Sequence, residues 1–218
     1  MYAFPDLVQR IAAEGHEIGH HGWVHENPAD FDRDGERRNL EIGFEALDRV
    51  LGVRPCGYRS PVWNFSPNTV ELLLEAEFVY ETSCQAHDYY PYYLRRNDQW
   101  PIDAPYVFGP TTELIEMPVN WGVDDFPHFE LVRGVYSNLS APSKVLEIWQ
   151  ADFDYMVENC PDGALNLTMH PQAIGRGHRM AMVERLIEHL RAGRARFEPL
   201  IDYVRRWKHY AGALKRIG

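Results

Sequence analysis

The stretch Glu17-Ile-Gly-His-His-Gly-Trp-Val-His-Glu-Asn-Pro28 places His21 and His25 four residues apart. On a helical turn, residues four apart lie on the same face, one above the other. Two imidazoles held in this way can bind one divalent metal ion through their ring nitrogens. The spacing therefore indicates a two-histidine metal site, which still needs a third protein ligand, usually a carboxylate, and an open position for water.

The same histidines also permit a simpler interpretation. Zinc proteases of the H-E-x-x-H type need a glutamate directly after the first histidine, and Gly22 at that position excludes them. His20, His21 and His25 could instead be polar loop residues, or core histidines whose hydrogen bonds are satisfied. The choice between a metal site and this alternative depends on the other motifs of the chain.

Size and composition limit the class of protein. The 218 residues suffice for one domain with a sizeable core. The net charge of −10 argues against nucleic acid or an anionic membrane as the main partner. Cys56, Cys84 and Cys160 are too far apart to indicate a disulfide framework or a thiolate metal site. No apolar run could span a bilayer and residues 1–10 do not resemble a signal peptide, so we expect a cytoplasmic protein.

The spacing of apolar residues predicts alternating helices and strands. We expect a long, irregular loop over residues 84–110, which are rich in Pro, Tyr and Asp. The alternation predicts an α/β fold with parallel strands, in which the carboxyl ends of the strands carry the active site. The expected helices cover residues 5–13, 34–51, 67–76, 142–159, 177–192 and 199–216, and the expected strands cover residues 17–19, 55–61, 78–80, 114–119 and 164–169.

Two further motifs follow predicted strands. In Leu167-Thr-Met-His170-Pro171, a histidine at the end of an apolar strand could donate a proton to a leaving group, or could only cap the following turn. In Arg59-Ser-Pro61-Val-Trp63, the arginine could orient a carboxylate through two parallel hydrogen bonds, or could form a surface salt bridge.

A fourth motif, Asn120-Trp121-Gly-Val-Asp124-Asp125-Phe126, offers two adjacent carboxylates beside aromatic side chains. Adjacent residues of a strand point to opposite faces, so we expect only one of Asp124 and Asp125 to enter a site.

Taken jointly and in this order, the motifs resemble those of the polysaccharide deacetylase family, the NodB-homology domains. The resemblance covers nearly the whole chain and is greatest to the branch that contains a Helicobacter-type peptidoglycan deacetylase and allantoinase-like relatives. The family's fold is a distorted (β/α) barrel. The segments that carry the resemblance are His16-Glu-x-Gly-x-His21-Gly, His25-Glu-Asn-Pro28, His87-Asp-Tyr-Tyr-Pro-Tyr-Tyr93 and Trp121-x-x-Asp124-Asp125.

The resemblance implies a role for each motif. His21 and His25 would bind one divalent metal ion of the zinc type, His170 would be the general acid, and Arg59 would orient a catalytic aspartate. The substrate would be an N-acetylated carbohydrate or a small cyclic amide, and the relatives suggest a symmetric oligomer. The residues expected to line the substrate site, with ordinary packing as the alternative for the aromatic ones, are Trp63, Tyr89, Tyr90, Trp121, Asp124 and Asp125.

One motif of the family is absent. The first strand of the family ends in an aspartate pair, one the catalytic base and the other the third metal ligand, and it would precede the helix at residues 5–13. We therefore expect one domain over residues 1–218 that lacks its N-terminal strand, with Asp88, Asp124 or Asp125 as substitute ligands. The alternatives are an inactive binding or scaffold domain and a metal-free, allantoinase-like ureide hydrolase.

The acidic run Asp30-x-Asp32-x-Asp34-Gly35-x5-Glu41 matches the calcium-loop pattern of EF-hand proteins. Arg37 and Arg38 bring positive charge into this loop, and Pro28 interrupts the helix that would have to precede it. We expect these acids to cap the helix at residues 34–51 instead of binding calcium.

Overall fold

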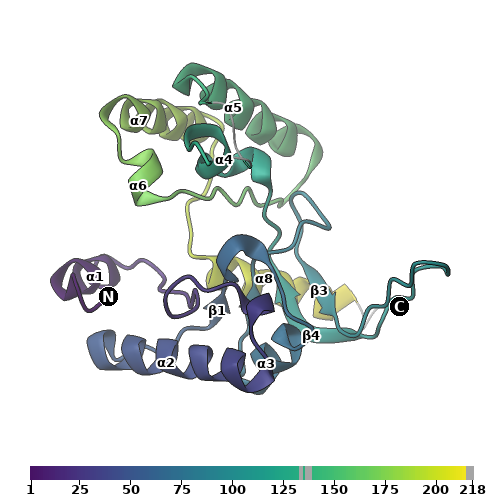
Figure 1. Cartoon of the computed structure of the whole chain (residues 1–218). Helices are drawn as coiled ribbons and strands as arrows, with labels where there is room; N and C mark the ends of the chain where they lie inside the picture. Colours follow the sequence, from purple (N-terminus) through teal and green to yellow (C-terminus); the bar gives the residue numbers. More distant parts are fainter. Residues whose placement is uncertain (133–134, 136–138, 215–218) are drawn as a thin grey trace. The chain divides into compact units, whose positions relative to one another are not determined.

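The structure is a computed structural model that describes residues 1–132, 135 and 139–214. It divides into two compact units (Figure 1). The first unit contains Met1–Cys84, Pro91–Met117 and Glu198–Gly218, and the second contains Gln85–Tyr90 and Pro118–Phe197. The expectation that residues 1–218 form one domain stays a prediction. Within the described residues, no helix combines the length and the apolar character needed to cross a membrane.

The first unit is built on an open four-stranded sheet with the strand order β1-β2-β4-β3. β1 pairs with β2 and β2 with β4 in parallel, whereas β3 pairs with β4 in antiparallel fashion. The predicted α/β class with parallel strands is therefore confirmed, although β3 lies inside the segment expected to be an irregular loop. The strands are β1 (Gly57–Tyr58), β2 (Tyr80–Glu81), β3 (Tyr92–Arg95) and β4 (Thr111–Glu116).

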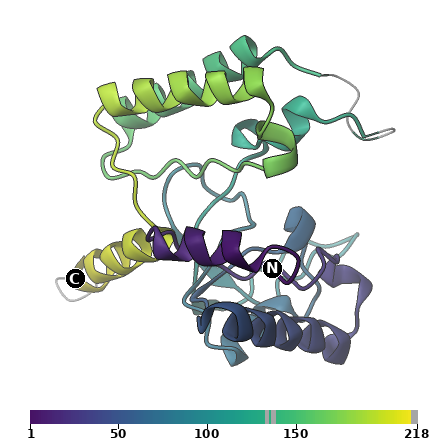
Figure 2. The same cartoon turned by 90° about the vertical axis from the view of Figure 1, so that its left-hand side faces the viewer.

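The helices of the first unit follow the predicted ranges closely. α2 begins where the Asp32 side chain accepts a hydrogen bond from the Gly35 N–H at 2.9 Å, and it ends at Gly52, whose φ of 63° is left-handed. The acidic run thus caps the helix as expected. α1 lies beside α2 in both views (Figure 1, Figure 2). The helices are α1 (Pro5–Ala13), α2 (Arg33–Leu51), α3 (Thr69–Glu75) and α8 (Leu200–Leu214), and residues 215–216 of the predicted last helix lie outside the described residues.

Apolar side chains of the sheet, α2 and α3 form the core of the first unit, with Leu40, Leu72 and Leu114 among its buried members. His20 belongs to the same layer, since it is only 1% exposed and its Nε2 lies 3.0 Å from the Leu40 carbonyl oxygen. A Cβ at Gly43 would overlap the His20 ring, so a glycine is required there. His20 is therefore a core histidine, and burial lowers its pKa below the ordinary value.

The second unit is helical, and its core lies between α5 and α7, which run side by side in both views (Figure 1, Figure 2). Trp149 of α5 is fully buried and donates its indole N–H to the Gly122 carbonyl at 3.0 Å. The helices are α4 (Asp125–Phe129), α5 (Pro142–Asn159), α6 (Pro171–Ile174) and α7 (Gly177–Ala192).

Two predicted strands are wrong in the same way. Neither residues 17–19 nor residues 164–169 form a strand ladder. His20, directly after the first segment, forms a single bridge with Tyr58, and Thr168 in the second segment forms a single bridge with Asp124. The Glu17 carboxylate instead accepts hydrogen bonds from the Tyr80 hydroxyl at 2.8 Å and the Ile201 N–H at 3.0 Å. Pairing with a neighbouring strand is non-local, and apolar content alone does not specify it.

Candidate active-site residues

His21 and His25 lie in an exposed loop of the first unit. Their ring centroids are 5.0 Å apart and the ring planes are at 82°. The spacing suggested a helical turn, but the segment is not helical. His25 has a left-handed φ of 64°. The Glu26 carboxylate folds the loop back by accepting the N–H groups of Trp23 at 2.9 Å and Val24 at 2.7 Å. A tight turn, and not a helix, brings the two imidazoles together.

A backbone carbonyl orients the first histidine. Nδ1 of His21 lies 2.8 Å from the Arg59 carbonyl oxygen, and the Arg59 N–H donates to the His20 carbonyl at 2.9 Å. Because a carbonyl oxygen only accepts, His21 carries its proton on Nδ1, and Nε2 keeps the lone pair that a metal ion requires. The donor type and tautomer therefore fit a metal ion of the zinc class.

Among the described residues, the clusters of possible metal ligands do not include the histidine pair. Two groups of three His, Cys, Asp or Glu side chains come within reach of one ion there, and neither contains His21 or His25. Asp88, one of the expected substitutes, is in neither group. The assignment of His21 and His25 as metal ligands stays a prediction.

The Arg59 motif forms a strained turn beside β1. The Arg59 guanidinium donates to Thr82 through Nε at 3.0 Å to the carbonyl and through an η nitrogen at 3.1 Å to the hydroxyl. Val62 and Trp63 both have a φ of 54°, which is costly for a β-branched or bulky residue. Trp63 is half-buried, with its ring centroid 6.0 Å from Cζ of Arg59. The expected role of Arg59 in orienting a carboxylate stays a prediction.

The second unit brings His170, Asp124 and Asp125 together. Nδ1 of His170 lies 2.7 Å from Oδ1 of Asp125 and 3.7 Å from Oδ1 of Asp124. The backbone N–H of His170 also donates to both carboxylate oxygens of Asp125, at 3.1 and 3.0 Å. Both aspartates are buried, whereas the His170 side chain is 27% exposed. A buried carboxylate thus fixes the ring of an accessible imidazole.

The prediction that only one of the two aspartates reaches the site is wrong. Asp124 is the N-cap of α4 and accepts the Phe126 N–H at 2.7 Å, and Asp125 is the first residue of that helix. The alternation of a strand does not apply at a helix start, so both carboxylates face His170. The bridge between Asp124 and Thr168 fixes the start of α4 beside His170, because the backbone N–H of Asp125 donates to the Thr168 carbonyl at 3.0 Å.

The aromatic residues expected to line the substrate site lie partly at the surface and partly in the core. Trp121 is 40% exposed, and Tyr90 is half-buried with its hydroxyl donating to the Pro161 carbonyl at 2.8 Å. Tyr89 is 6% exposed, packs in the core of the second unit and donates its hydroxyl to Asp152, which agrees with the packing alternative; its place in a substrate site stays a prediction. Tyr90 and Trp121 present surface.

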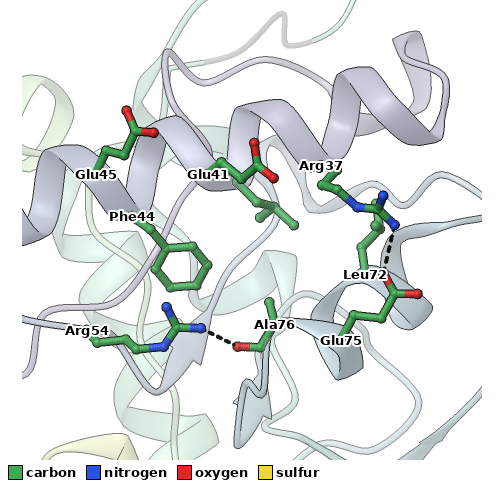
Figure 3. A pocket seen from close by; sticks show the side chains of 9 residues that line it. Arg37, Glu41, Phe44, Glu45, Arg54, Leu72, Glu75 and Ala76 are labelled. Atoms are coloured by element: carbon green, nitrogen blue, oxygen red, sulfur yellow. Dashed lines mark hydrogen bonds and ion pairs between the residues drawn. The ribbon is translucent and has the colours of Figure 1, made fainter.

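A separate pocket of about 380 Å³ lies on the first unit, between α2 and α3 (Figure 3). The Arg54 guanidinium lies 4.3 Å from the centroid of the Phe44 ring and donates to the Ala76 carbonyl at 2.9 Å. Arg37 pairs with Glu75 at 2.9 Å at the other end. The pocket contains none of the predicted site residues.

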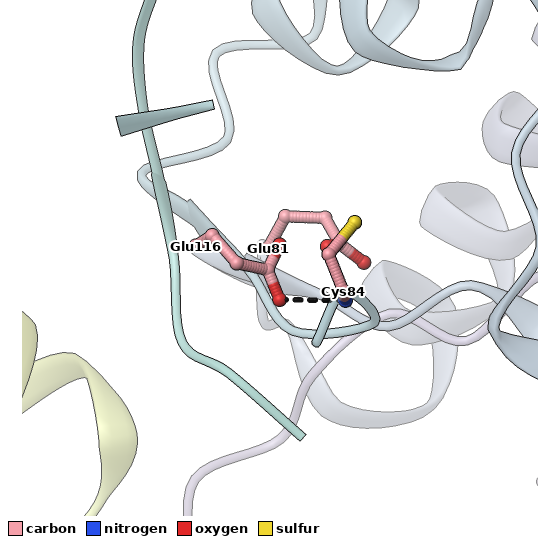
Figure 4. Close-up of side chains that lie close together, drawn as sticks. All are labelled: Glu81, Cys84 and Glu116. Atoms are coloured by element: carbon pink, nitrogen blue, oxygen red, sulfur yellow. Dashed lines mark hydrogen bonds between the residues drawn. The ribbon is translucent and has the colours of Figure 1, made fainter. Parts of the chain in front are cut away.

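The buried carboxylates Glu81 and Glu116 were not predicted from the sequence. They are register partners on β2 and β4, and Cys84 lies beside them (Figure 4). An acidic residue at the end of each of two apolar strand patterns, Tyr80-Glu81 and Ile115-Glu116, was the available signal. The register that joins them is set by the sheet, which the sequence pattern does not specify.

The chain is similar to known proteins in both sequence and structure. The model of the polysaccharide deacetylase family matches residues 1–80. A peptidoglycan deacetylase of Helicobacter pylori is 32% identical over 199 residues, which covers 86% of this chain and 68% of that protein. A structure described as a polysaccharide deacetylase of Mycobacterium smegmatis is 34% identical with a TM-score of 0.71, covering 87% of this chain and 61% of that one.

An allantoinase structure has the same fold, with a TM-score of 0.76 at 23% identity, and covers 94% of this chain and 63% of that one. At this identity the likeness concerns the fold alone. The chain thus spans between 61% and 68% of the lengths of these relatives.

Proposed function

The chain belongs to the polysaccharide deacetylase family, and we propose that it hydrolyses the C–N bond of acetamido groups on a carbohydrate of the peptidoglycan type. The observation that carries this proposal is the pairing of His170 with buried Asp125 at 2.7 Å. The substrate class is supported by the relative of Helicobacter pylori, which is named a peptidoglycan deacetylase. The products would be acetate and a free amine.

His170 is the proton donor of this reaction. The Asp125 carboxylate accepts from Nδ1, so Nε2 is the nitrogen that exchanges a proton with the substrate. As the C–N bond breaks, the amine nitrogen needs a proton to leave, and a positioned imidazolium supplies it. The buried carboxylate holds the ring in orientation and stabilises its charged form.

His21 and His25 hold a zinc-class ion in this proposal. The Arg59 carbonyl fixes the tautomer of His21 that leaves Nε2 for a metal. Bound there, the ion would polarise the amide carbonyl and lower the pKa of a water molecule. Each histidine therefore contributes a nitrogen ligand, and neither is the proton donor.

Exposed and half-buried aromatic side chains are the candidates for contact with the sugar in this proposal. Trp121 and Trp63 offer flat apolar faces, and Tyr90 adds a third aromatic side chain. Asp124, expected to bind substrate, is buried and caps α4 through the Phe126 N–H, so its role in this proposal is to support the His170 corner. Arg59 would orient a carboxylate of the reaction.

A small cyclic amide is the alternative substrate, and a binding or scaffold domain is the alternative function. The test compares acetate release from N-acetylglucosamine oligomers and peptidoglycan with turnover of allantoin, using the zinc-loaded chain. We expect acetate and free amines in equal amounts from the carbohydrates. Turnover of allantoin alone would support the cyclic amide, and a folded, zinc-loaded chain that turns over neither would support the scaffold.

A further inference from the structure

Three side chains that could bind a metal converge in the first unit. Glu81 and Glu116 are register partners on the adjacent parallel strands β2 and β4, and both are fully buried. Cys84 follows three residues after Glu81 and lies beside them (Figure 4). One ligand atom of each residue lies within 4.8 Å of those of the other two. The group shares no residue with the histidine pair.

Hydrogen bonds hold both carboxylates in fixed orientations. The Ser83 N–H donates to Oε2 of Glu81 and to Oε1 of Glu116, at 2.9 Å in each case. The Cys84 N–H donates to the same Glu116 oxygen at 2.8 Å, and the Ser83 hydroxyl donates to Oε1 of Glu81. Oε2 of Glu116 is buried and has no hydrogen-bond partner among the described residues. A proton held between the two carboxyl groups gives a hydrogen bond between Glu81 and Glu116, and the Cys84 thiol also hydrogen-bonds to Glu116, so a cation at this oxygen would displace these protons.

The charge of this group is not neutralised by a basic side chain. Within residues 1–132, 135 and 139–214, no arginine or lysine forms an ion pair with either carboxylate. Burial raises the pKa of Glu81 and of Glu116, and it raises the pKa of the Cys84 thiol, as do the two carboxylates. Raised pKa values favour the neutral, protonated forms of these groups, so in the folded chain either protons or a bound cation balance their charge.

We propose that Glu81, Glu116 and Cys84 form a second metal site, which binds a divalent cation of the zinc class. A proton shared by Glu81 and Glu116 would require no third side chain. Zinc, in contrast, is bound by cysteine sulfur together with carboxylate oxygen, so the position of Cys84 favours a cation. Sulfur disfavours calcium and magnesium, which prefer oxygen ligands only. The cation deprotonates the thiol, so its binding releases a proton.

The test uses cobalt(II) in the full chain, because a thiolate ligand produces a sulfur-to-cobalt charge-transfer band in the near ultraviolet. The background is the His21→Ala, His25→Ala double variant, which removes the other pair of ligands. We expect one equivalent of cobalt with this band, its loss in Cys84→Ser, and its retention in Cys56→Ser, a second half-buried cysteine. A band that persists in Cys84→Ser, or a background that binds no cobalt, would overturn the proposal.

A second variant separates the cation from a shared proton. Glu116→Gln mimics a protonated carboxyl, and Glu113→Gln on the exposed part of β4 is its matched control. Both substitutions are made in the His21→Ala, His25→Ala double variant. If the three residues form a metal site, zinc raises the Tm of the double variant itself and of the double variant with Glu113→Gln. Zinc does not raise the Tm of the double variant with Glu116→Gln. If a proton bridges the pair, Glu116→Gln keeps or raises the Tm and zinc has no effect in any of the three, which would refute the metal site.

Discussion

His170 in the second unit and His21 in the first are both oriented through Nδ1, but by acceptors of different charge. A buried carboxylate faces His170 at 2.7 Å, and a neutral backbone carbonyl faces His21 at 2.8 Å. A carboxylate stabilises the protonated imidazolium, whereas a carbonyl only selects the tautomer of the neutral ring. This difference is the basis on which we propose that an imidazole donates a proton in one unit and binds a metal in the other.

The largest expected effect breaks the comparison on the His170 side. His170→Ala removes the proton donor, and we expect the rate of acetate release to fall by about 10²–10⁴-fold, the usual contribution of general acid catalysis. His178→Ala, an exposed histidine of α7, is the control and should retain the rate. Equal rates for His170→Ala and the control would show that His170 is not the acid.

The next effect concerns the loop that carries the metal ligands. Glu26→Ala removes the acceptor of the Trp23 and Val24 N–H groups, so the two imidazoles lose their fixed separation. We expect zinc affinity at this site to fall by about 10–100-fold, as for other supporting residues of metal ligands. Chelator competition measures it, and Glu45→Ala on the exposed side of α2 is the control. Unchanged affinity would mean that Glu26 does not support the site.

A smaller effect tests the buried third histidine, His20. Gly43→Ala places a methyl group against the His20 ring, and we expect the free energy of unfolding to fall by about 1–3 kcal/mol because the core becomes overpacked. Gly177→Ala in α7, where a Cβ meets open space, should be neutral or stabilising by contrast. Urea unfolding measures both, and a stabilised Gly43→Ala would contradict the packing described for His20.

The smallest effect is a pH dependence. Burial lowers the pKa of folded His20, with opposing contributions from the Leu40 carbonyl and Glu26. Below about pH 6.5, the unfolded state therefore binds a proton that the folded state excludes, and His20 reduces stability as the pH falls. Between pH 7.5 and pH 5, wild type should lose more unfolding free energy than His20→Gln. An equal loss in both would show that His20 does not titrate in this way.

Local features of the chain were predicted well. The ranges of α1, α2, α5 and α7 agree with the sequence prediction, because apolar spacing and end signals such as Asp32 and Gly52 act within a few residues. The α/β class followed from the alternation of predicted helices and strands, and the family followed from the motifs and their order.

Features that depend on distant partners were not predicted. Within the described residues, the strand predicted at residues 164–169 is reduced to the single bridge between Thr168 and Asp124. His21 and His25 come together through a turn that is held by hydrogen bonds to the Glu26 carboxylate. The spacing of residues in the sequence does not indicate these hydrogen bonds. The contact between Glu81 and Glu116 depends on the register of β2 and β4, and the packing of Tyr89 depends on the core of the second unit.

The most direct test of the contrast between the two imidazoles is the zinc content of two single variants, measured beside the wild type by elemental analysis. Our account predicts that His21→Ala contains one equivalent of zinc less than the wild type, whereas His170→Ala keeps the wild-type content and loses only the rate of acetate release. Zinc lost from His170→Ala, or retained in full by His21→Ala, would contradict the assignment of proton donor and metal ligand.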